Sequence, residues 1–101
     1  MAYNGLMEDM RTIASLGVPS RVPVCALSEE FDVKWYGRDT YEDIILDSEK
    51  LAQCTIAATR EFDYDWAWLQ VDDCIEFEVL GVGSAGGGNI LRATCDYLPA
   101  T

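Results

Sequence analysis

The longest apolar run in the chain, residues 66–71, ends in two carboxylates, Asp72 and Asp73. One glutamine interrupts the run, and two of its residues are tryptophans. A run of this length that is bounded by acidic residues is typical of a β-strand buried on both faces of a sheet. Residues 21–26 form a second apolar run, rich in valine, and predict another strand, with Pro23 at its beginning or at a sheet edge.

Helical periodicity, in which apolar residues recur on one face, accounts for much of the remaining chain. Three helices are predicted, each behind a capping residue: one from Asn4 to about Leu16, residues 41–46 behind Asp39 or Thr40, and residues 48–62 behind Asp47. Residues 74–80 alternate between apolar and acidic like a strand, but they also fit a short helix, which we favour. Residues 27–37 predict a loop with a helical turn, and residues 81–88 a flexible glycine-rich loop.

The order of these elements is helix, strand, two helices, strand and helix, which is typical of βα units around a parallel sheet. A full (β/α)8 barrel takes about 250 residues, whereas this sequence has 101. We therefore predict an α/β fold made of the amino-terminal βα units of a TIM barrel, incomplete in this chain. The expected organisation is one partial domain, with a leading helix in residues 1–19, the first βα units in residues 20–81 and a flexible glycine-rich tail in residues 82–101.

Charge and composition narrow the classes of partner. The sequence has 18 acidic and 7 basic residues, so its net charge is −11, and an acidic surface repels nucleic acids and anionic membranes. No segment approaches the roughly 20 apolar residues of a membrane span. The four cysteines form no Cys-x-x-Cys pair, which suits reduced thiols in a cytoplasmic protein. Because the sequence has no histidine, we expect no metal and no cofactor in this chain.

Asp72 and Asp73 are the first candidates for chemistry, because ligands in α/β proteins bind at the carboxyl ends of strands. A single carboxylate there can accept hydrogen bonds from N–H groups of a small-molecule substrate or stabilise a developing positive charge. The alternative is that both aspartates merely end the strand. Glu76 and Glu78 follow closely, and we interpret them as a solvent-facing surface.

Two further patterns favour structural interpretations. Gly81, Gly83 and Gly86 match the G-x-G-x-x-G fingerprint, but successive glycines oppose the helix start that a dinucleotide site requires. We therefore interpret this segment as a mobile loop. The aromatic residues around the predicted second strand favour core positions over ligand stacking; they are Trp35, Tyr36, Tyr64, Trp66 and Trp68.

Three segments resemble, in this order and spacing, the amino-terminal third of the uroporphyrinogen decarboxylase superfamily. They are SRVPV at residues 20–24, DSEKLAQCTIAATREFDYD at residues 47–65 and LQVDDCIEFEVLG at residues 69–81. The superfamily contains decarboxylases of tetrapyrrole (heme, porphyrin) biosynthesis and corrinoid-dependent methyltransferases. Its fold is a (β/α)8 barrel, so the resemblance implies the same class as the order of elements.

The resemblance also implies a site residue. In the decarboxylases an aspartate at the end of an early strand holds the pyrrole N–H groups of the substrate. Counting back without gaps from the Leu80–Gly81 pair places Asp72 at this catalytic position. Asp73 is one residue away and is the alternative, as a substrate-binding residue.

One departure from the decarboxylases favours the methyltransferases. Where the decarboxylases carry an arginine-containing segment that grips substrate carboxylates, residues 26–37 contain three acids and one lysine, which would repel a polycarboxylate. In the methyltransferases, zinc held by a His-x-Cys and a distant Cys activates a thiol that accepts a methyl group from a corrinoid protein. This chain lacks such ligands, so zinc is expected only in a full-length parent.

The sequence therefore predicts a fragment of a uroporphyrinogen decarboxylase-like enzyme whose parent transfers a methyl group from a corrinoid protein to a thiol. Uroporphyrinogen decarboxylation is the alternative, and a non-catalytic remnant that acts as a binding or assembly module is a second one. We expect the isolated chain to be inactive. An incomplete barrel would also leave apolar surface on residues 21–26 and 66–71, so self-association is expected.

Overall fold

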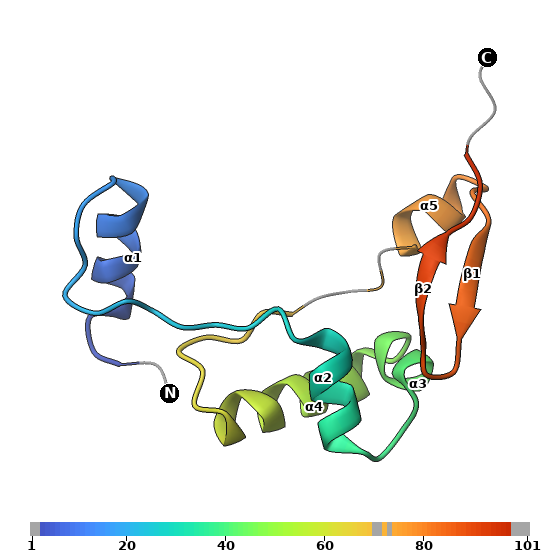
Figure 1. Ribbon diagram of the computed structural model, residues 1–101, viewed down its shortest axis with the longest axis horizontal. Coiled ribbons are helices and arrows are strands. Elements are labelled where there is room, and N and C mark those ends of the chain that lie inside the picture. The colour runs from blue at the N-terminus through green and yellow to red at the C-terminus, as the bar shows by residue number, and fades with distance from the viewer. Residues whose placement is uncertain (1–2, 70–71, 73, 98–101) are drawn as a thin grey trace.

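The computed structural model describes residues 3–69, 72 and 74–97. Within these residues, five helices precede a two-stranded sheet (Figure 1). The elements are α1 (Leu6–Ala14), α2 (Glu29–Tyr36), α3 (Tyr41–Ile45), α4 (Ser48–Glu61), α5 (Ile75–Val79), β1 (Ser84–Gly87) and β2 (Ile90–Thr94). The five helices correspond to the three predicted helices, the predicted helical turn and the short helix favoured before the glycine segment.

Local capping chemistry fixes the starts of α3 and α4. Thr40 forms a reciprocal capping box with Asp43, in which each side chain accepts the other residue's backbone N–H at 3.2 Å. The Asp47 carboxylate accepts the N–H groups of Glu49 and Lys50, at 3.0 and 3.1 Å. The predictions of Thr40 and Asp47 as capping residues are thus confirmed. The prediction of Asn4 is wrong, because α1 begins behind Gly5 instead.

The core lies where α2, α3 and α4 pack together. Its buried members are Val33, Tyr41, Ile44, Ile45 and Cys54, with Tyr36 and Leu51 packed against them. A partly exposed aromatic group lies beside this core at the carboxyl end of α4, where the Phe62 ring lies 5.4 Å from Phe31, 5.0 Å from Trp35 and 5.8 Å from Tyr64. The prediction of Trp35 and Trp68 as core residues is wrong, because they are 39% and 52% exposed.

The predicted strands at residues 21–26 and 66–69 form no strand in the described chain, and residues 70–71 lie outside the described residues. The first segment nevertheless contacts the residue directly before the second one, because the Asp65 N–H donates to the Val24 carbonyl at 2.8 Å. The Val24 N–H, which would enter a strand ladder, donates instead to the Asp65 carboxylate at 2.8 Å. Pro23 has no N–H to donate. These groups explain why the contact does not extend into a ladder.

The described strands, β1 and β2, form an antiparallel hairpin in residues predicted to be flexible. Ser84 pairs with Thr94, and Ala85 with Ala93, before a bulge shifts the register to Gly87 and Ile90. The antiparallel pairing follows from the short connection, since parallel strands need a crossover of a dozen or more residues. The described elements therefore mix helix and strand, while the barrel stays a prediction.

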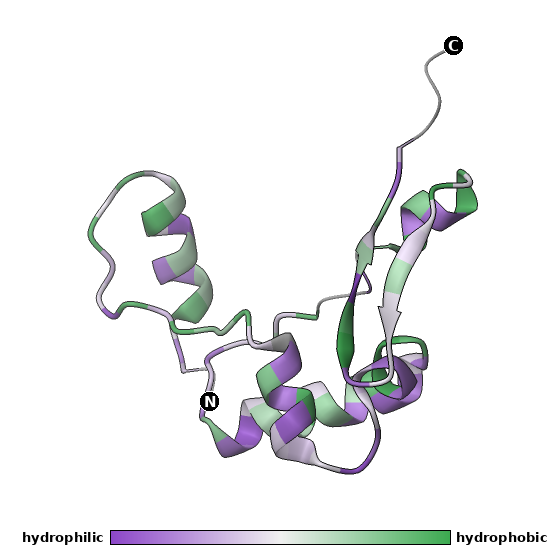
Figure 2. Ribbon diagram, turned by 45° about the vertical axis from the view of Figure 1, so that its right-hand side comes forward, coloured by the Kyte–Doolittle hydropathy of each residue, from purple (hydrophilic) through white to green (hydrophobic). Residues whose placement is uncertain are grey.

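The chain is expanded for its length. Its radius of gyration is 17.0 Å, against about 13 Å for a compact domain of 100 residues. Figure 1 shows α1 at one end and the hairpin at the other, with α2, α3 and α4 between them. Figure 2 shows hydrophobic residues along the extended segment between α1 and α2, where Val22 and Leu27 are 72% and 69% exposed. Among the described residues, the helices are all too short or too polar to span a membrane.

Candidate functional site

Asp72, the predicted site residue, lies buried in front of α5. Its side chain is 2% exposed, and its Oδ2 atom lies 2.5 Å from the Nη1 atom of Arg92 on β2. Its Oδ1 atom accepts the N–H of Cys74 at 3.2 Å. Both carboxylate oxygens are therefore bound by the chain itself. Asp73, the alternative, lies outside the described residues.

Arg92 joins Asp72 to the hairpin and to α5, in a group we call the Arg92 cluster: Asp72, Glu78, Ser84 and Arg92. The Nη2 atom of Arg92 donates to the Glu78 carboxylate. The same Nη2 atom lies 3.2 Å from the Ser84 hydroxyl, which also donates to Glu78. The guanidinium thus has an inner carboxylate, Asp72, and an outer one, Glu78, whose side chain is 37% exposed.

Mutual attraction keeps the cluster charged. The hydroxyl of Ser84 and the guanidinium of Arg92 hold the pKa of Glu78 below its ordinary value. Glu78 and Asp72 in turn raise the pKa of Arg92, although desolvation acts in the opposite direction. Glu78 lies on the exposed surface of α5, as predicted, and it also forms an ion pair with Arg92, which the sequence did not indicate.

The glycine segment has a structural role, since it forms the turn that places Arg92. Gly86 and Gly88 have φ values of +108° and +60°, which glycine adopts readily. The turn docks on the start of α3, where Glu42 donates its N–H to the Gly88 carbonyl at 2.8 Å and accepts the Gly88 N–H on its carboxylate at 2.7 Å. The Tyr41 N–H donates to the Asn89 side chain at 3.2 Å. These contacts hold the hairpin against the helical core.

Sequence reasoning missed Arg92, although one signal pointed to it. Arg92 is the only basic residue after Arg60, while four acids lie in residues 72–78. A single cation that follows a group of acids is a natural partner for one of them. Arg92 lies 20 residues after Asp72 in the sequence, so the pair could not be predicted without knowledge of the hairpin that brings the two residues together.

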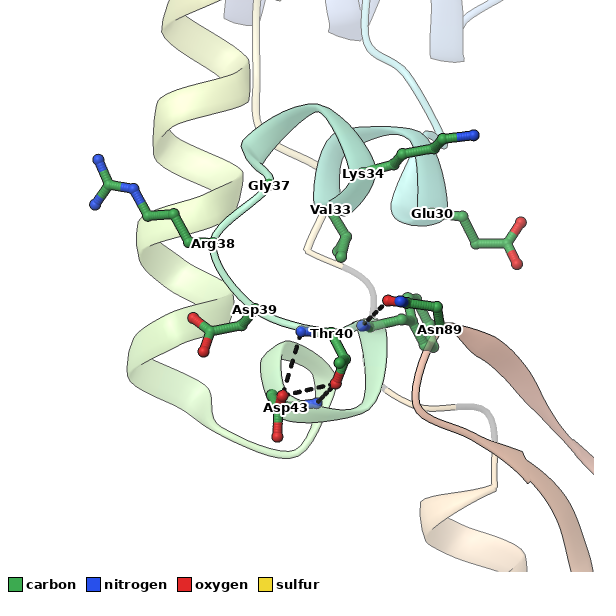
Figure 3. Close-up of a pocket in the computed structure, with 10 residues that line it drawn as sticks. Glu30, Val33, Lys34, Gly37, Arg38, Asp39, Thr40, Asp43 and Asn89 are labelled. Carbon is green, nitrogen blue, oxygen red and sulfur yellow. Dashed lines mark hydrogen bonds between the residues drawn. The ribbon is translucent and has the colours of Figure 1, made fainter.

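A separate cavity of about 770 Å³ lies between α2, α3 and the hairpin turn (Figure 3). Its charged side chains do not converge on one point, since Figure 3 shows Lys34 and Arg38 pointing away from each other. The Arg38 guanidinium instead stacks 4.8 Å from the centre of the Tyr36 ring. Asp39 forms an ion pair with Lys50 at 3.0 Å. The cavity is thus a polar surface hollow, and no member of the Arg92 cluster lines it.

A second buried polar network holds the segment after α1. The Asp9 carboxylate accepts the Tyr3 hydroxyl at 2.7 Å and the N–H groups of Ser20 and Arg21 at 2.7 and 3.1 Å. The Arg21 guanidinium lies 4.3 Å from the centre of the Tyr3 ring and 3.0 Å from the Asp65 carboxylate. Both oxygens of the Asp9 carboxylate accept hydrogen bonds from other parts of the chain, so Asp9 has a structural role. The buried Oδ1 atom of Asp65 accepts no hydrogen bond within the described residues, although it lies 3.0 Å from the Arg21 guanidinium.

The protonation of this network follows from its hydrogen bonds. The hydroxyl of Tyr3 and the groups donated by Ser20 and Arg21 lower the pKa of Asp9, although desolvation opposes the shift. Desolvation and the hydrogen bond to Asp9 raise the pKa of Tyr3 to about 12. At neutral pH the aspartate is therefore ionised and the tyrosine is a hydrogen-bond donor.

Metal-binding and thiol chemistry have no assembled site in the described chain. Among residues 3–69, 72 and 74–97, no three His, Cys, Asp or Glu side chains are grouped so that they could hold a metal ion. The four cysteines lie within these residues, and none forms a disulfide there. Burial raises the pKa of the Cys54 thiol to about 11, which disfavours the reactive thiolate.

When the chain is compared with known protein families, with curated proteins and with solved structures, none of them matches. The resemblance to the uroporphyrinogen decarboxylase superfamily therefore stays a prediction from the sequence.

Proposed function

We propose that this chain is the amino-terminal part of a cytoplasmic, uroporphyrinogen decarboxylase-like enzyme that transfers a methyl group from a corrinoid protein to a thiol. In this proposal Asp72 contacts the substrate, with Asp73 as the alternative. Zinc and the corrinoid protein would be bound by the remainder of the barrel.

The observation that carries the proposal is the contact between Val24 and Asp65. It joins the first predicted barrel strand to the residue directly before the second one. The Asp65 N–H donates to the Val24 carbonyl, and the Val24 N–H donates to the Asp65 side chain, both at 2.8 Å. Figure 1 shows both segments running the same way, from the side of α1 towards α2 and the hairpin. Adjacent segments with a common direction are what the first two strands of a parallel barrel require.

Exposed apolar side chains on the same two segments give further support. Val22 and Leu27 on the first segment are 72% and 69% exposed, and Trp68 and Leu69 on the second are 52% and 59% exposed. Side chains of this size normally become buried against another layer of structure. A barrel would supply that layer, and self-association is the expected behaviour of the chain without it.

The non-catalytic module is the second candidate, and a specific observation favours it. Asp72 is 2% exposed and ion-paired with Arg92, so the described chain already satisfies the carboxylate that the enzyme would offer to a substrate. Decarboxylation remains the alternative chemistry within the superfamily. It is disfavoured by the acids of residues 26–37.

The first experiment is to read the gene downstream of the Thr101 codon. An open frame of about 200 further residues would fit a barrel, and a His-x-Cys with a later Cys in it would support methyl transfer. A frame without those ligands would shift the proposal to decarboxylation. A stop codon directly after Thr101 would refute the enzyme and favour the module.

The second experiment tests Asp72 in the full-length parent. Asp72→Asn should lower kcat/KM for methylcob(III)alamin and a thiol by roughly 100-fold, the usual effect of removing one charge-stabilising group, and should leave the fold intact. The matched control is Glu76→Gln, since Glu76 is an exposed acid on α5. An effect of Asp73→Asn without one of Asp72→Asn would move the assignment by one residue. Turnover by the purified 101-residue chain would contradict its predicted inactivity.

A further inference from the structure

We infer that the Arg92–Asp72 ion pair is an autoinhibitory contact, in which the β1–β2 hairpin covers the carboxylate that the proposed function assigns to substrate. Asp72 becomes available to a ligand only when the Arg92 side chain leaves it. The inference rests on the proposed function for the identity of Asp72 as the contact residue, but the cover itself can be tested without any substrate.

Burial shows that the cover is complete in the described state. The Asp72 side chain is 2% exposed and the Arg92 side chain 11% exposed. A ligand that donates N–H groups would have to take the place that the Nη1 atom holds, 2.5 Å from Oδ2. The other oxygen already accepts the Cys74 N–H, so each carboxylate oxygen of Asp72 has a partner within the described residues.

The Arg92 side chain also has partners other than Asp72. Its Nη2 atom contacts Glu78 and Ser84, which lie nearer the solvent than Asp72 does. The guanidinium can therefore release the inner carboxylate and keep the outer one, by rotation about its own side-chain bonds. The hairpin backbone need not move, because its turn remains hydrogen-bonded to Glu42 on α3.

The balance of charges favours the covered state while no ligand is present. Uncovering Asp72 leaves a buried carboxylate without its cation, which is costly. A ligand with planar N–H donors or a delocalised positive charge restores that interaction, whereas a neutral ligand without donors does not. The contact thus selects for ligands that replace the guanidinium, and it lowers their apparent affinity by the fraction of time that Arg92 is in place.

Carboxyl footprinting of the full 101-residue chain tests the cover. A carbodiimide with glycine ethyl ester converts accessible carboxyl groups to amides, and mass spectrometry locates each amide. In the unmodified chain, Asp72 should react at least tenfold more slowly than the exposed Glu76. Arg92→Met should raise the rate at Asp72 at least tenfold. Ser84→Ala is the matched control, since it removes a neighbouring hydroxyl but leaves the guanidinium, and it should leave Asp72 slow.

The hydrogen exchange of the Glu42 amide shows whether the hairpin stays seated in Arg92→Met. If it detaches, Arg92→Lys replaces that variant, because an ammonium group lacks the fork that spans both carboxylates, and Asp72 should then react at an intermediate rate. Slow reaction of Asp72 with the hairpin seated in either variant would overturn the inference. So would reaction of Asp72 as fast as Glu76 in the unmodified chain.

Turnover by the full-length parent separates this inference from the proposed function. With methylcob(III)alamin and a thiol, Arg92→Met should lower KM, because the internal competitor is gone. If neither Asp72→Asn nor Asp73→Asn affects turnover, the proposed function fails, while the footprint still decides whether Arg92 covers the Asp72 carboxylate. A fast footprint together with an unchanged KM would refute autoinhibition.

Discussion

Replacement of Gly86 by alanine is the sharpest test of the hairpin turn. Gly86 has a φ of +108°, and a Cβ atom built there would lie 2.5 Å from the Leu91 carbonyl oxygen and 3.0 Å from the Cα atom of Arg92. All of these neighbours are backbone atoms of the opposing strand. They cannot move without changing the pairing of β1 with β2.

Two costs add in Gly86→Ala. Left-handed backbone costs a residue with a Cβ atom roughly 1–2 kcal/mol, and overpacking against a fixed neighbour costs about 1–3 kcal/mol. The sum is about 2–5 kcal/mol. A two-stranded hairpin is marginally stable by itself, so we expect the hairpin to detach from α3 before the helical core unfolds.

Amide hydrogen exchange followed by NMR reads this detachment directly. The Glu42 N–H lies in the first turn of α3 and donates to the Gly88 carbonyl, so its protection depends on the seated hairpin. A loss of 2 kcal/mol or more should speed its exchange by at least about 30-fold, at 1.4 kcal/mol for each factor of ten. Amides within α4 should keep their rates.

Gly88→Ala is the matched control. Gly88 has a φ of +60°, and a Cβ atom there would meet nothing within 4 Å, so only the backbone cost of about 1–2 kcal/mol applies. Equal acceleration of Glu42 exchange in both variants would refute the contribution of the Leu91 clash. If the Glu42 amide exchanges as slowly in Gly86→Ala as in the unmodified chain, the described turn is refuted.

Three other predictions concern the helical core and its surroundings. Asp47→Ala should lower the free energy of unfolding by about 1 kcal/mol in urea titrations, because α4 loses its capping carboxylate; an unchanged midpoint would contradict the cap. Since the pKa of Asp9 is lowered in the folded chain, its contribution is fully present above its ordinary pKa and is lost as the pH falls through the folded value. Urea midpoints should therefore fall on acidification, less steeply in Asp9→Asn, and parallel curves would refute this. The Cys54 pKa, raised from 9.0 to about 11, should make its alkylation at pH 8 roughly 100-fold slower than in the unfolded chain; equal rates in the folded and urea-unfolded chain, measured by mass spectrometry, would contradict its burial.

Local chemistry made the helices predictable from the sequence. Thr40 and Asp47 satisfy backbone N–H groups two or three residues ahead of them, so the signal and its effect lie within one helical turn. The favoured helix over residues 74–80 appears as α5, one residue shorter at each end. Asn4 failed as a cap because Gly5, which has a φ of +98°, takes that position.

Features that depend on distant partners could not be predicted in the same way. The apolar run at residues 66–71 has the composition of a buried strand, but a strand also needs a neighbour with unpaired backbone groups. Residues 81–88 were predicted to form a flexible loop, because glycine permits both a loop and a tight turn and the sequence alone does not distinguish them. What fixes the turn is Glu42, 46 residues away from Gly88.

The candidate site could likewise be predicted only in part. Asp72 could be found because it ends an apolar run, which is a local property of the sequence. Its burial and its partner could not, since Arg92 reaches it only through the fold of the hairpin. The lone positive charge after Arg60 was the available clue, but it did not specify which of the nearby acids would be buried.

The network around Asp9 imposes an order on folding during synthesis. Arg21 pairs with Asp65 across 44 residues, so Arg21 leaves the ribosome before this partner, when only the contacts of its segment with Asp9 can form. At about 5–20 residues per second, that partner arrives several seconds later, after the core of α2, α3 and α4 has been translated. The segment that is made first is therefore held by local contacts alone until Asp65 emerges, and until then it is more open to chaperones and proteases.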